Sequence, residues 1–440
     1  MNGDGKLDLV TGKRLFGHDG RDESEFDPLF LFWYDIQGGK FQRHVISFNH
    51  LQYDFRKLFD EMERQIDAVV VATPVHTHAV IGMAAMKRGK HVYMEKPVTH
   101  NVGEARTLRD FARRQKVVTQ MGSQGMATDS FRRTLELIEE GAIGEIREAH
   151  VLFESGGTGP LERPRDQPAV PASLDWDLWI GPAPMRPYHP EYLPPQFPGA
   201  GGVPESSALI GWNRWRDFGA GALGGAGSHS INLAFKALNL AALWNDAGGK
   251  RTIRVETEVS ERCPENYPRC QIVRFDVPAR GSRPPARIHW CNAWDTEIKK
   301  RGMLAELEKL GGQPLKWASG SWSPHSFLLL VGSKGRAFAN FHNSVCKLLP
   351  EGDFPNSGGP PQRLPRSGSH EREWAKACKG GPRPMSNFEH SGPALELLLL
   401  GNVAALVDQP LEFDPGTCTI VNQEEANRML HPPYRTGWTL

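Results

Sequence analysis

The pattern of hydrophobic and polar positions is most regular between residues 68 and 94. Residues 68–72 form a short apolar run rich in β-branched side chains, which is typical of a strand buried on both faces. Apolar side chains recur at helical spacing from 78 to 88 and stop at Gly89, a residue type that commonly ends a helix. Residues 91–94 form a second apolar run. The pattern therefore predicts a strand, a helix and a strand, which together make a βαβ unit of a parallel sheet.

Two short segments follow these predicted strands directly. Thr73 and Pro74 come after the first strand, and Glu95, Lys96 and Pro97 come after the second. Parallel sheets of this kind bind their ligands at the carboxyl ends of the strands. A lysine before a proline has a restricted, extended backbone, so its amine can be aimed at a reacting group. Lys96 is therefore the strongest candidate for acid–base catalysis, although a surface lysine beside a turn would have the same local sequence.

Regular elements continue along the rest of the chain. Asn101 and Glu104 have capping-box spacing and open a predicted helix that ends near residue 115. We expect one α/β unit over 49–150 and an α+β unit over 151–440. The further predicted elements are a strand at 117–120, a helix at 128–140, strands at 146–153, 253–260, 270–277, 286–294, 325–331 and 336–340, and a helix at 394–406.

Residues 1–48 do not follow this pattern. A dinucleotide-binding sheet should open with a strand, a Gly-x-Gly-x-x-Gly loop and a helix, and that series is not found before residue 49. Residues 2–10 instead resemble the calcium loop of FG-GAP or VCBS-type repeats, although a turn with solvated polar residues explains them equally. Residues 30–34 predict a strand that could pair with the edge of the sheet. We expect this segment to be a fragment of a different domain, joined by fusion or by gene-model error.

Composition narrows the classes of partner. The 440 residues contain 52 Lys plus Arg against 51 Asp plus Glu, so no basic excess points to nucleic acid or an anionic membrane. No apolar run approaches the ~20 residues of a membrane span, and no signal peptide is visible, so a cytoplasmic location is expected. The six cysteines are scattered and no zinc-ligand spacing occurs, so no metal site is predicted.

The motifs of the central region carry a resemblance to a known family. The series Ala72-Thr-Pro, His78, Gly89-Lys-His-Val and Glu95-Lys-Pro resembles the Gfo/Idh/MocA oxidoreductases, from about residue 53 to the C-terminus. The resemblance implies a Rossmann-like parallel sheet, truncated here, followed by a domain with a large, mostly antiparallel open sheet. It also implies NAD or NADP as cofactor, hydride transfer to or from a sugar, cyclitol or related polyol, and a homo-oligomer formed through the second sheet.

The resemblance also assigns roles to individual residues. It places Lys96 at the hydroxyl or carbonyl being interconverted and implies a cis Lys96–Pro97 bond. His76 and His78 could equally be satisfied residues at the start of a helix. The residues that it implies for cofactor binding are Thr73, Pro74, His76, His78, Glu95, Lys96, Pro97 and Gln120.

A second catalytic candidate is His229. Relatives carry Gly-Asp-x-Gly-x-His-x-x-Asp here, whereas this chain has Gly225 in place of the first acid and Asn232 in place of the second. Asp217 is a possible substitute for the missing acid, and helix capping is the alternative role for His229. The stretch 219–224 is a literal Gly-x-Gly-x-x-Gly, but no buried strand precedes it, so we do not interpret it as a dinucleotide loop.

Aromatic side chains are frequent in the loop-rich stretch 155–227. Tryptophan faces can stack on sugar C–H surfaces, but they can also anchor long loops by packing. With the motif around His229, this stretch supplies the predicted substrate-binding residues, which are Trp176, Trp179, Trp212, Trp215, Arg216 and Asn232.

Three functions are compatible with these observations. The first is an NAD(P)-dependent oxidoreductase acting on a polyol, with dinucleotide binding weakened by the missing glycine-rich loop. The second is a non-catalytic, degenerate relative that binds sugars. The third is NAD-dependent glycoside hydrolysis through transient oxidation.

Overall fold

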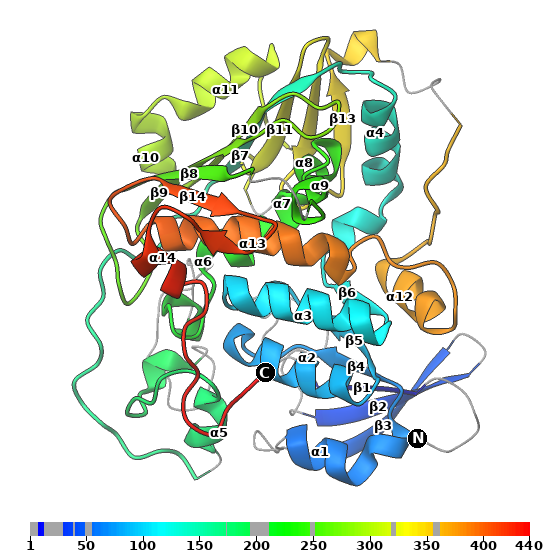
Figure 1. Ribbon diagram of the computed structural model, residues 1–440, viewed down its shortest axis with the longest axis vertical. Coiled ribbons are helices and arrows are strands. Elements are labelled where there is room, and N and C mark those ends of the chain that lie inside the picture. Colours follow the sequence, from blue (N-terminus) through cyan, green and yellow to red (C-terminus); the bar gives the residue numbers. More distant parts are fainter. Residues whose placement is uncertain are drawn as a thin grey trace.

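The computed structural model of the chain describes residues 8–12, 30–37, 40–48, 55–172, 174–193, 211–246, 251–317, 323–354 and 361–440, with side chains from residue 55 onward. Two sheets lie at opposite ends of the molecule in Figure 1, and the helices α3 (Val102–Gln115) and α13 (Phe388–Ala404) run side by side between them. A Cβ atom built on Gly392 of α13 would lie 3.1 Å from Cβ of Arg109 on α3. The two helices therefore pack backbone to backbone and join the sheets.

The first sheet has six strands in the order β3-β2-β1-β4-β5-β6. The strands β1, β4, β5 and β6 are parallel, as the sequence predicts for the last three. The strands β2 and β3 are antiparallel to their neighbours. The bounds are β1 Asp8–Gly12, β2 Phe30–Gln37, β3 Lys40–Phe48, β4 Ala68–Val71, β5 His91–Met94 and β6 Thr119–Met121.

The N-terminal segment differs from its predicted place. Residues 30–34 belong to β2, which does not pair with β4. That position is taken by β1, whose Leu9–Thr11 backbone pairs in parallel with 68–70. The strands β1, β2 and β3 therefore extend this sheet beyond β4, because β1 forms backbone hydrogen bonds with β4 on one side and with β2 on the other. Residues 2–7 of the calcium-loop comparison lie outside the described residues.

Helices flank the parallel strands. The predicted capping box is confirmed, since the Asn101 side chain accepts from Glu104 N and the Glu104 carboxylate accepts from Asn101 N. Helix α2 begins at Val75, earlier than predicted, directly after Pro74. The other helices near this sheet are α1 Phe55–Met62 and α12 His370–Cys378, whereas α4 Asp129–Glu139 lies beside the second sheet (Figure 1).

The second sheet has nine strands in the order β13-β12-β11-β7-β10-β9-β8-β14-β15. Only the pair β7–β10 is parallel among its described strands, so the predicted mostly antiparallel sheet is confirmed. The short strands β13, β14 and β15 were not predicted. The bounds are β7 Ile146–Phe153, β8 Ile253–Val259, β9 Cys270–Val277, β10 Ala286–Ala293, β11 Phe327–Gly332, β12 Arg336–Asn340, β13 Cys346–Leu349, β14 Leu411–Asp414 and β15 Thr419–Ile420.

The two faces of this sheet are covered differently. One face packs on the main core with α13, which begins at Phe388 rather than at residue 394 despite Pro393 in its interior. The other face carries a smaller core that includes Leu152 and Cys291 and is covered by α10 and α11. The remaining helices are α5 Trp176–Ile180, α6 Gly221–Gly225, α7 Gly227–Ser230, α8 Asn232–Ala237, α9 Ala241–Trp244, α10 Asp295–Lys300, α11 Met303–Gly311 and α14 Glu424–Arg428.

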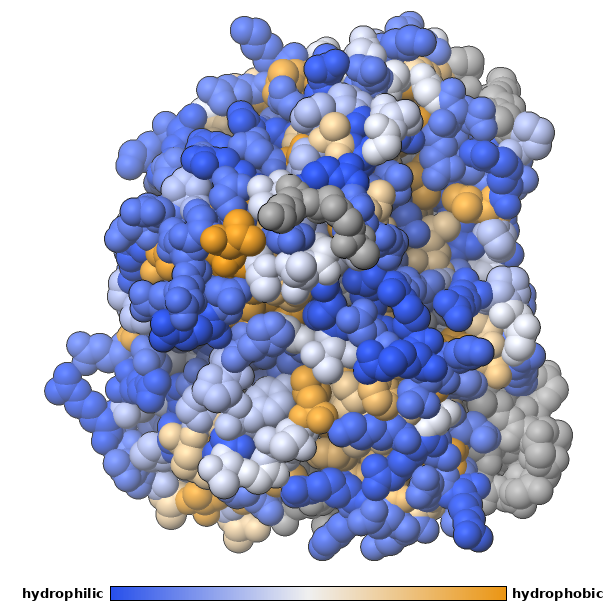
Figure 2. Space-filling model, in the orientation of Figure 1, coloured by the Kyte–Doolittle hydropathy of each residue, from blue (hydrophilic) through white to orange (hydrophobic). Residues whose placement is uncertain are grey.

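The visible surface is mainly hydrophilic. Hydrophobic residues on the face in Figure 2 occur in small groups separated by hydrophilic ones. Within the described parts of the chain, no helix combines the length and the apolar character needed to cross a membrane.

Candidate functional site

The carboxyl ends of β4 and β5 are tied together by one buried histidine. His78 lies on the first turns of α2, with Nδ1 2.9 Å from the Pro97 carbonyl oxygen and Nε2 2.7 Å from the Thr73 carbonyl oxygen. Both neighbours are acceptors, so the ring holds the two strand ends at a set distance. His78 therefore positions these two segments. This agrees with the interpretation that it is a hydrogen-bonded residue near the start of the helix.

Lys96 stands at the end of β5 and is half-buried, between half-buried Glu95 and buried Pro97. The Lys96–Pro97 peptide bond is cis, as the resemblance implies. The Glu95 carboxylate reaches across the end of β6, where a Cβ atom on Gly122 would lie 2.6 Å from its Oε2. A side chain at position 122 would displace the Glu95 carboxylate, so the ends of β5 and β6 form one continuous edge.

The second part of the molecule meets this edge through α6 and α7. A Cβ atom on Gly224 would lie 3.9 Å from Cγ of Pro97. The Ser123 hydroxyl donates to the Ser228 carbonyl oxygen at 2.8 Å. These contacts place the segment that carries His229 against the segment that carries Lys96, so the two predicted catalytic residues belong to one interface.

A second histidine, not predicted from the sequence, joins His229. The His342 ring packs edge-on against the His229 ring, with centroids 4.9 Å apart and planes at 74°. His342 follows β12, and a Cβ atom on Gly125 would lie 1.9 Å from its carbonyl oxygen, so this loop packs directly on the segment after β6. No local motif marks His342, because its place depends on the pairing of β12 within the second sheet.

Gly225 faces open space at this interface. It is half-buried, and a Cβ atom built on it would meet no heavy atom within 4 Å. The position that carries an acid in the resembling family is therefore empty rather than filled by a neighbour. Asp217 does not replace that acid, because Arg186 forms an ion pair with its carboxylate.

The glycines at 219–224 serve packing. A Cβ atom on Gly219 would lie 2.4 Å from the Asn213 carbonyl oxygen, and one on Gly221 would lie 2.6 Å from the Tyr267 ring. Helix α6, which follows, has only five residues. This geometry agrees with the interpretation that the stretch is not a dinucleotide loop.

His76 and Gln120 contact other segments of the chain. His76 Nε2 is 2.9 Å from the Trp179 carbonyl oxygen, and its ring packs on Trp179 and Phe218. Burial lowers the pKa of His76 to about 3, so the imidazole is neutral. Gln120 is fully buried and donates from Nε2 to the His370 carbonyl oxygen at 2.9 Å, beneath α12. Both side chains contribute to packing between segments.

The predicted substrate-binding tryptophans form a core of their own. Trp176 and Trp179 stack with centroids 4.8 Å apart, and Trp215 is 0% exposed beside Tyr192 and Phe218. Trp212 is only partly buried against this cluster. Because the rings of Trp176 and Trp215 are covered, the structure supports the interpretation that they anchor the long loops.

Arg216 and Asn232 are also held by their surroundings. The Arg216 guanidinium donates from Nε to the Cys263 carbonyl oxygen at 2.7 Å and lies over the Tyr267 ring, and burial lowers its pKa. Asn232 is 1% exposed, donates to the Ser228 carbonyl oxygen and accepts from His390 Nε2 at 2.8 Å. Asn232 therefore braces the helix that carries His229.

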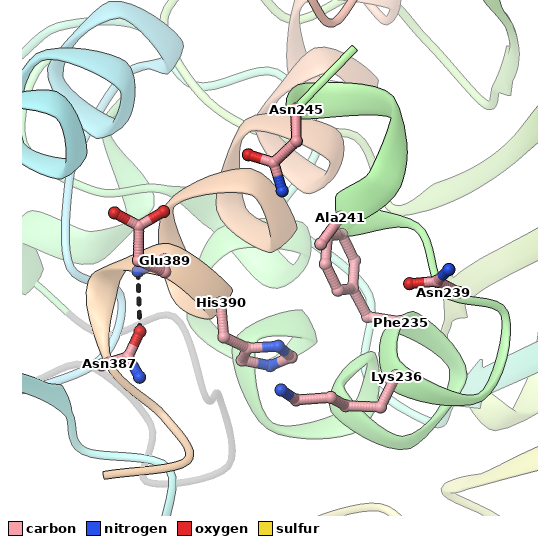
Figure 3. A pocket seen from close by; sticks show the side chains of 8 residues that line it. All are labelled: Phe235, Lys236, Asn239, Ala241, Asn245, Asn387, Glu389 and His390. Carbon is pink, nitrogen blue, oxygen red and sulfur yellow. Dashed lines mark hydrogen bonds between the residues drawn. The ribbon is translucent and has the colours of Figure 1, made fainter. Parts of the chain in front are cut away.

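A separate pocket of about 270 Å³ lies between α8, α9 and the start of α13. Figure 3 shows the Lys236 amine pointing toward the His390 imidazole inside it. Burial lowers the pKa of both groups, and the Lys236 charge adds to the effect on His390. None of the predicted catalytic, cofactor or substrate residues lines this pocket, whose lining is Phe235, Lys236, Asn239, Ala241, Asn245, Asn387, Glu389 and His390.

The strand ends fit one part of a dinucleotide. The first turn of α2 has no side-chain cap and directly follows Thr73 and Pro74, at the edge that also carries Lys96. The segment after β1, where a Rossmann sheet holds the pyrophosphate, falls in residues 13–29, outside the described residues.

Comparison with known proteins finds similarity in the part of the chain that contains Thr73 and Lys96. Residues 34–123 match the profile of the Gfo/Idh/MocA oxidoreductase family, described as having an NAD-binding Rossmann fold. Levoglucosan dehydrogenase of Pseudarthrobacter phenanthrenivorans is 33% identical over 100 residues, which are 23% of this chain and 25% of that protein. Myo-inositol 2-dehydrogenase of Thermotoga maritima is 28% identical over 97 residues, 22% of this chain and 29% of that protein. The matches thus span between a quarter and a third of these relatives.

Solved structures align over more of the chain. That of levoglucosan dehydrogenase in complex with NADH and L-sorbose covers 82% of this chain and 82% of its own, with 15% identity and a TM-score of 0.48. That of an inositol dehydrogenase homologue from Azotobacter vinelandii, complexed with NADH and myo-inositol, has 16% identity and a TM-score of 0.46 over 82% of each chain.

Proposed function

We propose that this chain, whose residues 34–123 belong to the NAD-binding Rossmann region of the Gfo/Idh/MocA oxidoreductases, is an NAD(P)-dependent dehydrogenase of a sugar, cyclitol or related polyol. The observation that carries the proposal is the junction of the cis Lys96–Pro97 segment with α6 and α7. It leaves Lys96 half-buried at a strand end, beside the segment of His229.

The proposed chemistry needs a base at the substrate hydroxyl. The nicotinamide, when bound, supplies the acceptor of the hydride. Lys96 takes the hydroxyl proton as the carbonyl forms and returns it in the reverse reaction. His78 holds the Thr73 and Pro97 carbonyls and thereby sets the direction of the Lys96 amine. Thr73, Pro74 and the first N–H groups of α2 would contact the cofactor.

His229 and His342 supply the other side of the proposed substrate site. His229 is only 5% exposed, so it contributes a fixed hydrogen-bonding atom rather than a mobile one. Gly225 brings no acid to this side of the proposed site. We therefore expect turnover to be slower than in an otherwise equal site with an acid, by a factor within the ~10²–10⁴ range of acid–base groups.

A turnover assay tests the proposal. The full chain is incubated with NAD⁺ or NADP⁺ and a panel of cyclitols and sugars, and reduced cofactor is followed by absorbance. We expect reduction with at least one polyol and its loss in Lys96→Met. Titration calorimetry with each cofactor runs in parallel. No binding heat at millimolar cofactor together with no turnover would reject the dehydrogenase.

One specific feature favours a second candidate, a sugar-binding relative without catalysis. The open position at Gly225 has lost the acid that relatives carry. Sugar binding in the absence of cofactor, unchanged in Lys96→Met, would support this alternative, whereas cofactor-dependent turnover would exclude it.

A further inference from the structure

Two histidines and a glutamate meet on one face of the nine-stranded sheet. Along β7 the side chains alternate, so Ala149 and Val151 enter the main core while Glu148 and His150 point to the opposite face. On the neighbouring strand β10, His289 points to that same face, because Ile288 and Trp290 enter the main core. Glu148, His150 and His289 therefore project together beside the small core beneath α10 and α11.

The geometry of the three side chains is close to that of a metal-binding site. His150 and His289 are register partners on parallel strands, and their rings stack with centroids 4.5 Å apart and planes within 4°. Glu148 Oε2 lies 2.9 Å from His150 Nε2. One ligand atom from each of the three lies within 4.8 Å of the others. A tetrahedral ion with bonds of about 2.0–2.1 Å needs its ligands about 3.3 Å apart, so the stacked rings must turn their nitrogens toward a common point to bind one.

The cluster is partly open to solvent, since Glu148 and His289 are half-buried. Glu148 is half-exposed, with 45% of its side chain accessible, so water can complete the coordination of an ion there.

Two arginines on the same face act against a cation. Arg287 is the register partner of Glu148, but Asp276 forms an ion pair with it and offsets its charge. Arg274 is the register partner of His289 on β9. The positive charge of Arg274 should weaken the binding of a cation without preventing it. Replacing Arg274 should therefore strengthen cation binding, whereas replacing one of the three clustered side chains should weaken it.

We propose that Glu148, His150 and His289 form a Zn²⁺-binding site, with water completing a four-coordinate shell. Two imidazoles and one carboxylate are an established ligand set for zinc. The site is independent of the proposed dehydrogenase chemistry, because none of its residues belongs to the interface of Lys96 and His229.

Titration calorimetry on the chelator-treated full chain tests the site, with zinc chloride as the probe at pH 7.5. We expect one Zn²⁺ per chain with a micromolar or tighter dissociation constant. His289→Gln removes a ligand and should weaken binding by about 100-fold or more, and Glu148→Gln by about 10-fold or more. Arg274→Gln should tighten binding by about 2- to 10-fold, because a nearby positive charge is removed.

Two control variants separate coordination from general charge. His431→Gln removes an exposed histidine elsewhere, and Glu424→Gln removes an exposed carboxylate from α14. Neither should change zinc binding by more than about 2-fold. Glu148→Gln changes a half-exposed side chain and keeps the test valid if His289→Gln does not fold. Absence of stoichiometric binding at 100 µM zinc would overturn the proposal. Equal binding by Glu148→Gln and His431→Gln would overturn it as well.

Discussion

Replacing Arg106 by methionine should destabilise the fold far more than the loss of one surface ion pair. Arg106 on α3 donates to both oxygens of Glu396 on α13, at 3.0 and 2.8 Å. Trp244 Nε1 also donates to Glu396, at 2.8 Å. The Glu396 side chain is 0% exposed. Burial raises the pKa of Glu396, and the Arg106 and Trp244 hydrogen bonds oppose this rise.

The expected loss of unfolding free energy follows from the charge that remains on Glu396. Without Arg106, a fully buried carboxylate loses its cationic partner and keeps neutral hydrogen-bonding neighbours such as Trp244 and Cys418. Removing one partner of a buried pair costs about 3–5 kcal/mol. Methionine retains most of the apolar volume, so a cavity contributes little. Arg106→Met combined with Glu396→Gln leaves no buried charge and should recover at least about half of the loss.

Urea unfolding, followed by tryptophan fluorescence and circular dichroism, measures these free energies. The matched control is Arg113→Met on the same helix. Arg113 pairs with Glu389 of α13, but the two side chains are 48% and 33% exposed, so the expected loss is at most about 1 kcal/mol.

The pH dependence supplies a second criterion. In Arg106→Met the folded-state pKa of Glu396 rises further above its unfolded-state value. The deficit should therefore be full above the folded-state pKa and shrink as the pH falls through it. Equal losses for Arg106→Met and Arg113→Met, or a deficit that grows between pH 7.5 and 5.5, would refute the reasoning.

Three further predictions concern the candidate site. Lys96→Met should lower kcat by about 10²–10⁴-fold, with little change in the melting temperature because this side chain is half-buried. Steady-state kinetics measures the effect. An unchanged kcat would show that Lys96 takes no part in the chemistry. His78→Phe should cost about 1–3 kcal/mol in urea unfolding, because the Pro97 carbonyl loses a buried partner, and should lower kcat through the Lys96 segment; unaltered stability would contradict the bridging role. Gly225→Asp should fold normally, because its Cβ meets no atom within 4 Å, and should raise kcat; a fall in kcat would show that the open space is needed by substrate.

Much of the first sheet could be predicted because its signals are local. The apolar runs of β4 and β5 and the periodicity of α2 place the strand ends that carry Thr73 and Lys96. The capping box of α3 depends on two residues one helical turn apart. Such features depend on hydrogen bonds and spacing within a few residues, so the chain encodes them without reference to its other parts.

Side-chain direction was harder to predict. Gln120 lies on the predicted strand, yet its side chain faces α12, whose His370 is distant in sequence. His76 lies just before the helix predicted at 78–88, but only the packing of α5 decides that its ring meets Trp179. The tryptophans of α5 were compatible with sugar stacking or with loop anchoring until their partners were known. In each case the deciding contact comes from another segment of the chain.

The amino-acid sequence by itself determined the βαβ unit, the strand ends and the position of Lys96, since these depend on neighbouring residues. Only the tertiary structure decided that β1 joins β4, that His342 meets His229, and that His150 stacks on His289. It also decided that Arg106 pairs with Glu396 across 290 positions of the chain. Contacts between distant segments depend on the packing of many side chains at once, and no local pattern of residues specifies that packing.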